Sequence, residues 1–281
     1  MQVGVHVSIS GSIDRAVDNA MTLKCTAFQI FTRSPRGWAA KDLAKEEVEN
    51  FKAKLVSSKI DPYAICAHMP YLPNLSCPKK MLYNKSVKSL IVELDRCGTL
   101  GIPYLVTHLG SHLGKGLDIG LERIVAAFNL ALSESNSYVM LLLENMAGQK
   151  NSMGSSFEDI KRILNGIEKK DRAGLCFDTA HAYAAGYDLR TSRGVKETLQ
   201  KFDATLGLGW MKVVHLNDSQ GGLGSGRDRH EHIGMGYIGE EGFRTLFKHE
   251  TICKLPCIME TPIDERRDDR GNIRKVRELS A

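Results

Sequence analysis

Short apolar runs alternate with longer segments of helical periodicity along the whole chain, and this alternation most constrains the fold. The intervening segments are helix candidates, with apolar residues three to four apart in 121–132 and a glycine, Gly101, at the end of 84–101. The seven candidates are residues 12–24, 41–59, 84–101, 121–132, 156–167, 195–207 and 241–249. Eight runs have the length and composition of buried strands: residues 3–8, 27–32, 63–68, 104–110, 139–145, 173–181, 211–218 and 255–261. Eight strand–helix units without a Pro-, Gly- or Ser-rich linker predict an α/β fold, a single (β/α)8 TIM barrel domain over residues 1–281. An open doubly wound sheet is the alternative, but its phosphate-binding patterns GxGxxG and GxxxxGK[ST] are both absent.

Composition sets the class of protein. The chain has 281 residues, of which 42% are hydrophobic, enough to bury a large core. The net charge of +5 permits an anionic partner such as nucleic acid without requiring one. Seven scattered cysteines without a CxxC pair indicate reduced thiols rather than a zinc knuckle. Neither a signal peptide nor an apolar run of membrane-spanning length is present, so we expect a cytoplasmic, soluble protein with no membrane partner.

Polar side chains end almost every predicted strand. In a (β/α)8 barrel these ends form one rim, which holds the active site. Unpaired buried charges there would cost several kcal/mol each, so a bound multivalent cation is the economical explanation. Imidazole together with carboxylate favours Zn²⁺, Mn²⁺ or Fe²⁺ over Ca²⁺. The candidate ligands are His68, His108, Glu144, Asp178, His181, His215, Asp228, His230 and Glu260.

Nine ligands exceed the coordination of one tetrahedral ion, so we expect two or three ions with a bridging carboxylate. Such a cluster suits phosphate ester hydrolysis, because the ions activate a water and neutralise the phosphate oxygens. Asp178 and His181 could bind different ions, whereas Asp228 and His230, if locally extended, point the same way and could bind one ion. The glycine-rich stretch 221–226 gives the backbone freedom to carry that pair across the barrel mouth. His232 is expected to be solvated or to support the ligands, and His6, His112 and His249 are expected to be structural, loop and helix-surface residues.

The segments around these residues resemble the endonuclease IV family, the zinc-dependent AP endonucleases of base excision repair. The resemblance runs from HVS at 6–8 to MET at 259–261, almost the whole chain. It rests on HMPYLPNL (68–75), THLGSH (107–112), LLEN (142–145), GLCFDTAHAYAAGYD (174–188) and HLNDSQGGLGSGRDRH (215–230). It implies cleavage of the phosphodiester 5′ to an abasic site in duplex DNA, which leaves a 3′-hydroxyl and a 5′-deoxyribose phosphate, together with removal of 3′-blocking groups.

The resemblance also implies three zinc ions and a division of the ligands among them. The first ion would be held by His68, His108 and Glu144; the second by Glu144, Asp178, His215 and Glu260; and the third by His181, Asp228 and His230. A metal-activated hydroxide would attack the phosphate in line. Glu144, with Glu260 as the second candidate, would position or deprotonate this nucleophile. Mn²⁺ or Fe²⁺ could replace zinc at some sites.

DNA contacts follow from the same resemblance. Arg36, Tyr71 and Leu72 would enter the duplex at the lesion and hold the abasic nucleotide out of the stack, with ordinary loop packing as the other interpretation of Tyr71 and Leu72. The rim arginines would meet phosphates: Arg33, Arg36, Arg227 and Arg229. Two positions depart from the family pattern: Gln220 replaces its usual lysine, and GMG at 234–236 replaces its frequent GEG. We expect a monomer, associated with the nucleoid if the source is prokaryotic.

Two other functions remain open. A sugar isomerase or epimerase on the same barrel would need one or two ions held mostly by carboxylates, and the set His181, Asp228 and His230 argues against it. The other is a barrel that binds damaged DNA without cutting it. All the candidate ligands are present, so the sequence does not support a loss of cleavage. Nicking of a duplex with one abasic site would separate the three.

Overall fold

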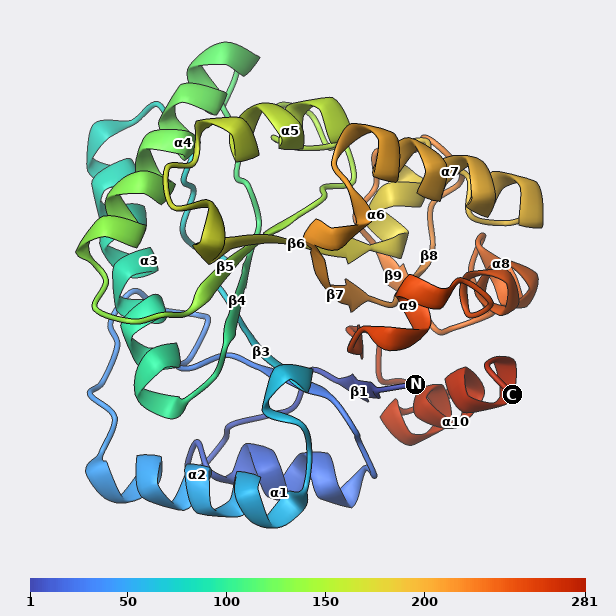
Figure 1. The fold of residues 1–281 in the computed structure, drawn as a ribbon, viewed down its shortest axis with the longest axis horizontal. Coiled ribbons are helices and arrows are strands. Elements are labelled where there is room, and N and C mark those ends of the chain that lie inside the picture. Colours follow the sequence, from blue (N-terminus) through green and yellow to red (C-terminus); the bar gives the residue numbers. More distant parts are fainter.

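A barrel of eight parallel strands forms the centre of the computed structural model, which describes residues 1–281 (Figure 1). Its strands are β1 (Val3–Val5), β2 (Phe28–Ile30), β3 (Ile65–His68), β4 (Tyr104–Thr107), β5 (Met140–Glu144), β6 (Ala173–Asp178), β7 (Met211–His215) and β10 (Cys257–Met259). The sheet closes between β1 and β2 through a parallel bridge that joins His6 to Gln29. All eight predicted strands are present, and the predicted (β/α)8 barrel is confirmed.

Helices surround the barrel in Figure 1. Seven of them match predicted segments: α1 (Arg15–Thr22), α2 (Lys45–Ser58), α3 (Lys80–Leu100), α4 (Leu117–Glu134), α5 (Phe157–Gly166), α7 (Ser192–Thr205) and α8 (Gly239–Leu246). Gly101 ends α3 in the left-handed conformation, as its position predicts. The sequence interpretation missed α6 (Thr179–Ala184), α9 (Glu250–Lys254) and α10 (Asp269–Leu279). Helix α10 packs against β1, so the two ends of the chain lie side by side (Figure 1).

The strands are short and buried on both faces. In β5, three consecutive leucines, Leu141 to Leu143, are fully buried, because one face points into the barrel and the other packs against helices. This double burial explains why the runs read as continuously apolar rather than alternating. It also leaves mainly the ends of the strands for polar side chains, and the fully buried Gln29 inside β2 is an exception.

All eight predicted strand runs extend beyond the observed strands, and in 173–181 the excess residues form a helix. Strand β6 ends at Asp178, and helix α6 begins at Thr179. The Asp178 side chain accepts a hydrogen bond from the His181 amide, so it caps the helix that carries His181. The cap turns the chain back over the rim instead of extending it. The run 63–68 was also too long, because Pro62–Ala64 form a 3₁₀ turn (η1) before β3.

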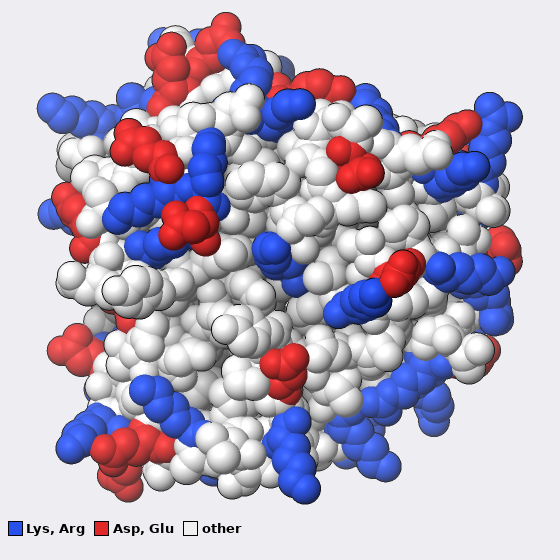
Figure 2. All heavy atoms as spheres, in the orientation of Figure 1, with Lys and Arg blue, Asp and Glu red and all other residues white.

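Outside the barrel, two short strands form an antiparallel ribbon after β7. Strand β8 (Asp218–Ser219) pairs with β9 (His230–Glu231). No helix is both long and apolar enough to cross a membrane. Figure 2 shows lysines and arginines interspersed with acidic side chains around the edge of the visible face, so the net positive charge does not gather into one patch there.

Candidate metal centre

The nine predicted ligands meet at the carboxyl-terminal rim of the barrel. Four of them are the last residues of strands β3, β5, β6 and β7: His68, Glu144, Asp178 and His215. His108 and Glu260 follow β4 and β10 directly. The strands are parallel, so all these ends face the same opening. His181 reaches it from α6, and Asp228 and His230 reach it from the β8–β9 ribbon.

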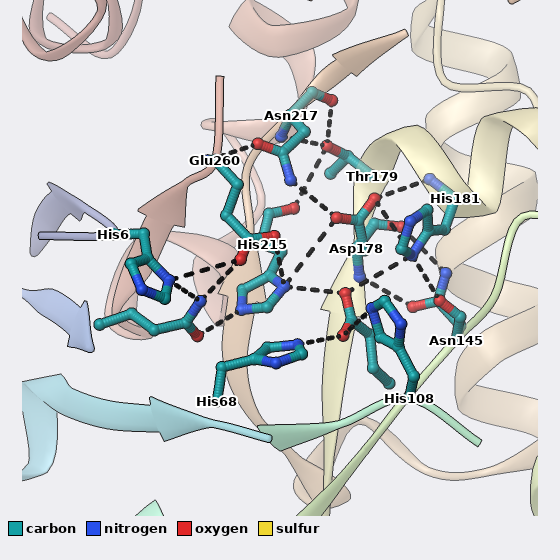
Figure 3. Close-up of polar contacts among 12 residues, drawn as sticks. His6, His68, His108, Asn145, Asp178, Thr179, His181, His215, Asn217 and Glu260 are labelled. Atoms are coloured by element: carbon teal, nitrogen blue, oxygen red, sulfur yellow. Dashed lines mark hydrogen bonds and ion pairs between the residues drawn. The ribbon is translucent and has the colours of Figure 1, made fainter. Parts of the chain in front are cut away.

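Glu144 lies at the middle of the cluster. One oxygen, Oε2, is 3.2 Å from Nε2 of His68 and 3.3 Å from Nε2 of His108. The other, Oε1, is 2.8 Å from Nδ1 of His215 (Figure 3). The carboxylate is fully buried, which alone would raise its pKa, but His215 and His108 hold the pKa of Glu144 well below its usual range. Glu144 is therefore an anion that can face two cations at once.

A second set of donors surrounds Asp178. Its ligand atoms, with those of Glu144, His215 and Glu260, all lie within 4.8 Å of one another. Those of Asp178, His181 and His230 form another such group. Asp228 joins this last group, since its Oδ1 lies 3.1 Å from Nε2 of His181 and 3.7 Å from Nε2 of His230.

Hydrogen bonds on the outer side of the cluster fix the tautomers of three imidazoles. Nδ1 of His68 lies 2.7 Å from the Met69 carbonyl, and Nδ1 of His181 lies 2.9 Å from the Asn145 carbonyl. Nδ1 of His230 lies 3.2 Å from the Glu260 carbonyl. A carbonyl only accepts, so each Nδ1 carries the hydrogen and donates it. Each Nε2 is then left facing the carboxylates, which is the arrangement of metal-binding histidines.

The residues present fit a metal. Nε2 of His181 and Nε2 of His230 are both buried without a hydrogen-bond partner, although both lie close to Asp228. A buried polar atom without a partner costs about 1–3 kcal/mol, so two side by side require a ligand. Imidazole nitrogens beside carboxylates are the donors that Zn²⁺ prefers, and Mn²⁺ and Fe²⁺ accept the same set.

One cysteine lies next to this cluster, contrary to the expectation of a site without thiols. Cys176 comes within 4.8 Å of Glu144 and His215. Burial raises the pKa of its thiol well above the usual range, which favours the neutral thiol over the thiolate that metals bind.

Three residues that hold the ligands were missed from sequence. Asn217 donates to Oδ2 of Asp178 at 2.7 Å and accepts from the Glu260 amide at 2.7 Å, which joins β6 to β10 (Figure 3). The Asn145 side chain donates to the Asp178 carbonyl and accepts from its amide. Gln29 on β2 contacts His215 and Glu260. A usable signal existed: each is a polar residue inside or directly after an apolar strand run.

The segment 218–239 is folded around Asp218. This buried carboxylate accepts hydrogen bonds from five backbone amides: those of Ser219, Gly234, Gly236, Ile238 and Gly239. A Cβ on Gly236 would lie 2.5 Å from Oδ1 of Asp218, so only glycine fits there. Met235 between the glycines is 45% exposed, which explains why GMG can replace GEG. Asp218 is thus an anchor of the loop rather than a ligand.

The remaining histidines lie outside the cluster. His232 is fully buried, so a solvated role for it is wrong. Its Nε2 donates to Asp264 and its Nδ1 accepts from Asn272 on α10. His6 contacts Gln29, His112 accepts from the Gly116 amide in a loop, and His249 precedes α9.

The predicted DNA contacts are exposed beside the rim. Tyr71 and Leu72 are 69% and 40% exposed, and the Tyr71 ring packs edge-on against Phe31 at 5.3 Å. Arg36 and Arg229 are exposed as well. Arg33 is not, because its side chain is buried against Glu93 and bonded to Ser89. The prediction that Arg33 meets phosphate is therefore wrong: its charge is already paired inside the protein.

Comparisons with known proteins agree on the fold and on the closest functional class. Residues 17–280 match the family model described as xylose isomerase-like TIM barrel. A probable endonuclease 4 from Nitrosopumilus maritimus is 55% identical over the full length of both chains. The crystal structure of endonuclease IV from Thermus thermophilus superimposes with a TM-score of 0.86 at 36% identity, covering 99% of this chain and 98% of that one. A D-tagatose 3-epimerase-like protein superimposes with a TM-score of 0.73 at 18% identity over 99% of this chain and 96% of the other, which shows the barrel alone.

Proposed function

The chain belongs to the endonuclease IV family of metal-dependent AP endonucleases, and from this membership we propose that it hydrolyses the phosphodiester 5′ to abasic sites in duplex DNA. The products are a 3′-hydroxyl and a 5′-deoxyribose phosphate, and the same site clears 3′-blocking groups. The observation that carries this proposal is the convergence of five imidazoles and three further carboxylates on Glu144, with two buried imidazole nitrogens left without a hydrogen-bond partner. The protein would act as a single-domain monomer on DNA in the cytoplasm.

We assign three metal ions, with zinc as the expected metal. His68, His108 and Glu144 would hold the first, and Glu144, Asp178, His215 and Glu260 the second. Asp228, His181 and His230 would hold the third. Support comes from the ligand atoms of the first two sets, which lie within 4.8 Å of one another, and from the close approach of Asp228 to both histidines of the third.

Bound ions would lower the pKa of a water molecule and neutralise charge on the phosphate and leaving oxygens. Glu144 and Glu260 would position the attacking water and take its proton. Burial alone would raise the pKa of Glu260, but His215 holds the pKa well below its usual range, so this carboxylate is an anion that could hold a metal and orient the water at neutral pH. His108 and Asp228 are one-third and one-quarter exposed, so the substrate can reach the cluster from their side. No serine or cysteine is needed as a nucleophile.

DNA would be held by Arg36, Tyr71, Leu72 and Arg229. The exposed aromatic and aliphatic side chains of Tyr71 and Leu72 stand beside the rim, where they could fill the gap left by an abasic nucleotide. Arg36 and Arg229 would contact phosphates, which makes binding weaken as salt increases.

A duplex oligonucleotide with one tetrahydrofuran residue tests the proposal. We expect nicking 5′ to the lesion, no nicking of the undamaged duplex, and loss of nicking after chelation that added Zn²⁺ restores. Metal analysis should give three ions per chain, and a 3′-phosphoglycolate end should be removed. Binding without nicking would instead support the non-catalytic barrel, and turnover of a ketose without DNA binding would support the epimerase.

A further inference from the structure

Gln29 is a buried amide that touches the candidate metal centre from β2, a strand that supplies no ligand. Its side chain is fully buried. Nε2 lies 2.7 Å from Oε1 of Glu260 and 3.0 Å from Nδ1 of His6. Oε1 lies 2.8 Å from Nε2 of His215 and 3.2 Å from Sγ of Cys66. The side chain therefore uses all of its hydrogen-bonding capacity.

These four contacts determine which way the amide faces. The Glu260 carboxylate only accepts hydrogen bonds, so the amide group beside it must be the NH₂. The second NH₂ hydrogen goes to Nδ1 of His6. The carbonyl oxygen of Gln29 must then face His215, and because this oxygen only accepts, Nε2 of His215 must carry the hydrogen.

His215 consequently has the opposite tautomer from His68, His181 and His230. In His68, His181 and His230 the hydrogen sits on Nδ1, bonded to backbone carbonyls. In His215 it sits on Nε2, and Nδ1 faces Glu144 at 2.8 Å and Glu260 at 3.4 Å. The acceptor opposite Nε2 of His215 is a side-chain oxygen from another strand, that of Gln29 on β2, rather than a backbone carbonyl.

We propose that Gln29 is a positioning residue that holds His215 with its hydrogen on Nε2 and its Nδ1 toward the metal centre, and that also orients the Glu260 carboxylate. One residue thus aligns two of the four expected ligands of the second ion. The hydrogen bond from Nε2 of His215 to Gln29 also makes Nδ1 a stronger electron-pair donor to a metal, as the hydrogen-bond partners of metal-binding histidines do. This inference rests on the metal centre of the proposed function.

Two substitutions separate the contacts from simple packing. Gln29→Met has a similar shape but neither donates nor accepts, so it should weaken retention of one ion about 10- to 100-fold. Gln29→Glu should retain that ion, because two carboxyl groups this close share a proton, and the protonated acid can donate to Glu260 and accept from His215. Cys66→Ala is the matched control: it removes a neighbouring contact to the same oxygen but leaves the bonds of Gln29 to His215 and Glu260 in place.

The readout is equilibrium competition of the metal-loaded protein with a chelator, with ions counted per chain. We expect Q29M to lose one ion early while the other ions and C66A follow the wild type. Equal weakening of all ions, or a wild-type profile for Q29M, would overturn the proposal.

A measurement on the wild type keeps the proposal testable if Q29M does not fold. In the zinc-loaded protein labelled with ¹⁵N-histidine, His215 should bind metal through Nδ1 and show a protonated Nε2, whereas His68, His181 and His230 should show the reverse. The other tautomer at His215 would refute the role of Gln29. A wild-type protein that binds no metal would refute the proposed function itself, so the two failures are distinguishable.

Discussion

Replacing Asp218 by asparagine should destabilise the protein strongly without touching a predicted ligand. The carboxylate accepts amides from Ser219 and Ile238 at Oδ1 and from Gly234, Gly236 and Gly239 at Oδ2. Asparagine has one acceptor oxygen, so its NH₂ must face at least two of these amides. Each buried amide left without an acceptor costs about 1–3 kcal/mol, which predicts a loss of about 2–6 kcal/mol in the free energy of unfolding.

The assay is urea unfolding in excess chelator, so that metal binding does not contribute to the measured free energy. Asp118→Asn is the matched control, because Asp118 is a largely exposed partner of Arg162 and its loss should change stability by no more than about 0.5 kcal/mol. Met235→Glu, which restores the frequent family residue at an exposed position, should behave like the control. If D218N unfolds within 0.5 kcal/mol of D118N, the five-amide anchor is not what holds this loop.

Three further predictions concern DNA, catalysis and pH. Tyr71→Ala should weaken binding to a tetrahydrofuran duplex by about 1–3 kcal/mol, as loss of one stacked aromatic does, with unchanged unfolding; unaltered anisotropy titrations would contradict this. Glu260→Gln should slow single-turnover cleavage about 10²- to 10⁴-fold, and a wild-type rate would remove Glu260 from the mechanism. Burial alone would lower the pKa of His181, but Asp178 and Asp228 raise it to about 10, so in chelator the wild type should lose stability as pH rises from about 6.5 to about 10. His181→Gln should show a shallower slope in urea titrations, because the pKa of His215 is raised as well and contributes the remainder; an unchanged slope would rule out His181 as a source.

The barrel and the convergence of the candidate ligands could be predicted, because both depend on the periodicity of apolar residues and on the order of strands and helices along the chain. Strands buried on both faces give continuous apolar runs, and their parallel arrangement places every terminal residue on one rim. Thus His68 and Glu144 could be brought together without knowing any contact between them. The division of ligands among ions came from the family resemblance, not from this geometry.

The parts that could not be predicted depend on contacts between distant segments. Gln29 looks like one polar residue in an apolar strand, and only closure of the barrel brings it to His215. The sequence predicts Asp178 at the end of a strand, but its side chain also caps the first turn of α6. Arg33 reads as a free cation, but α3 supplies Glu93 from 60 residues away. In each case the local sequence is compatible with several roles, and the packed partner decides among them.

The bridge that Asn217 makes between Asp178 and Glu260 has a consequence for biosynthesis. The proposed second set of ligands spans the chain from Glu144 to Glu260, and its last member follows the final barrel strand. A nascent chain still on the ribosome therefore lacks one donor of this ion until β10 has emerged. Until then, His215 and Asp178 lack Glu260 as the neighbouring ligand. The second ion would therefore bind fully only after synthesis has reached the end of the barrel. A chain that terminates before β10 would not retain this ion and could be distinguished in that way.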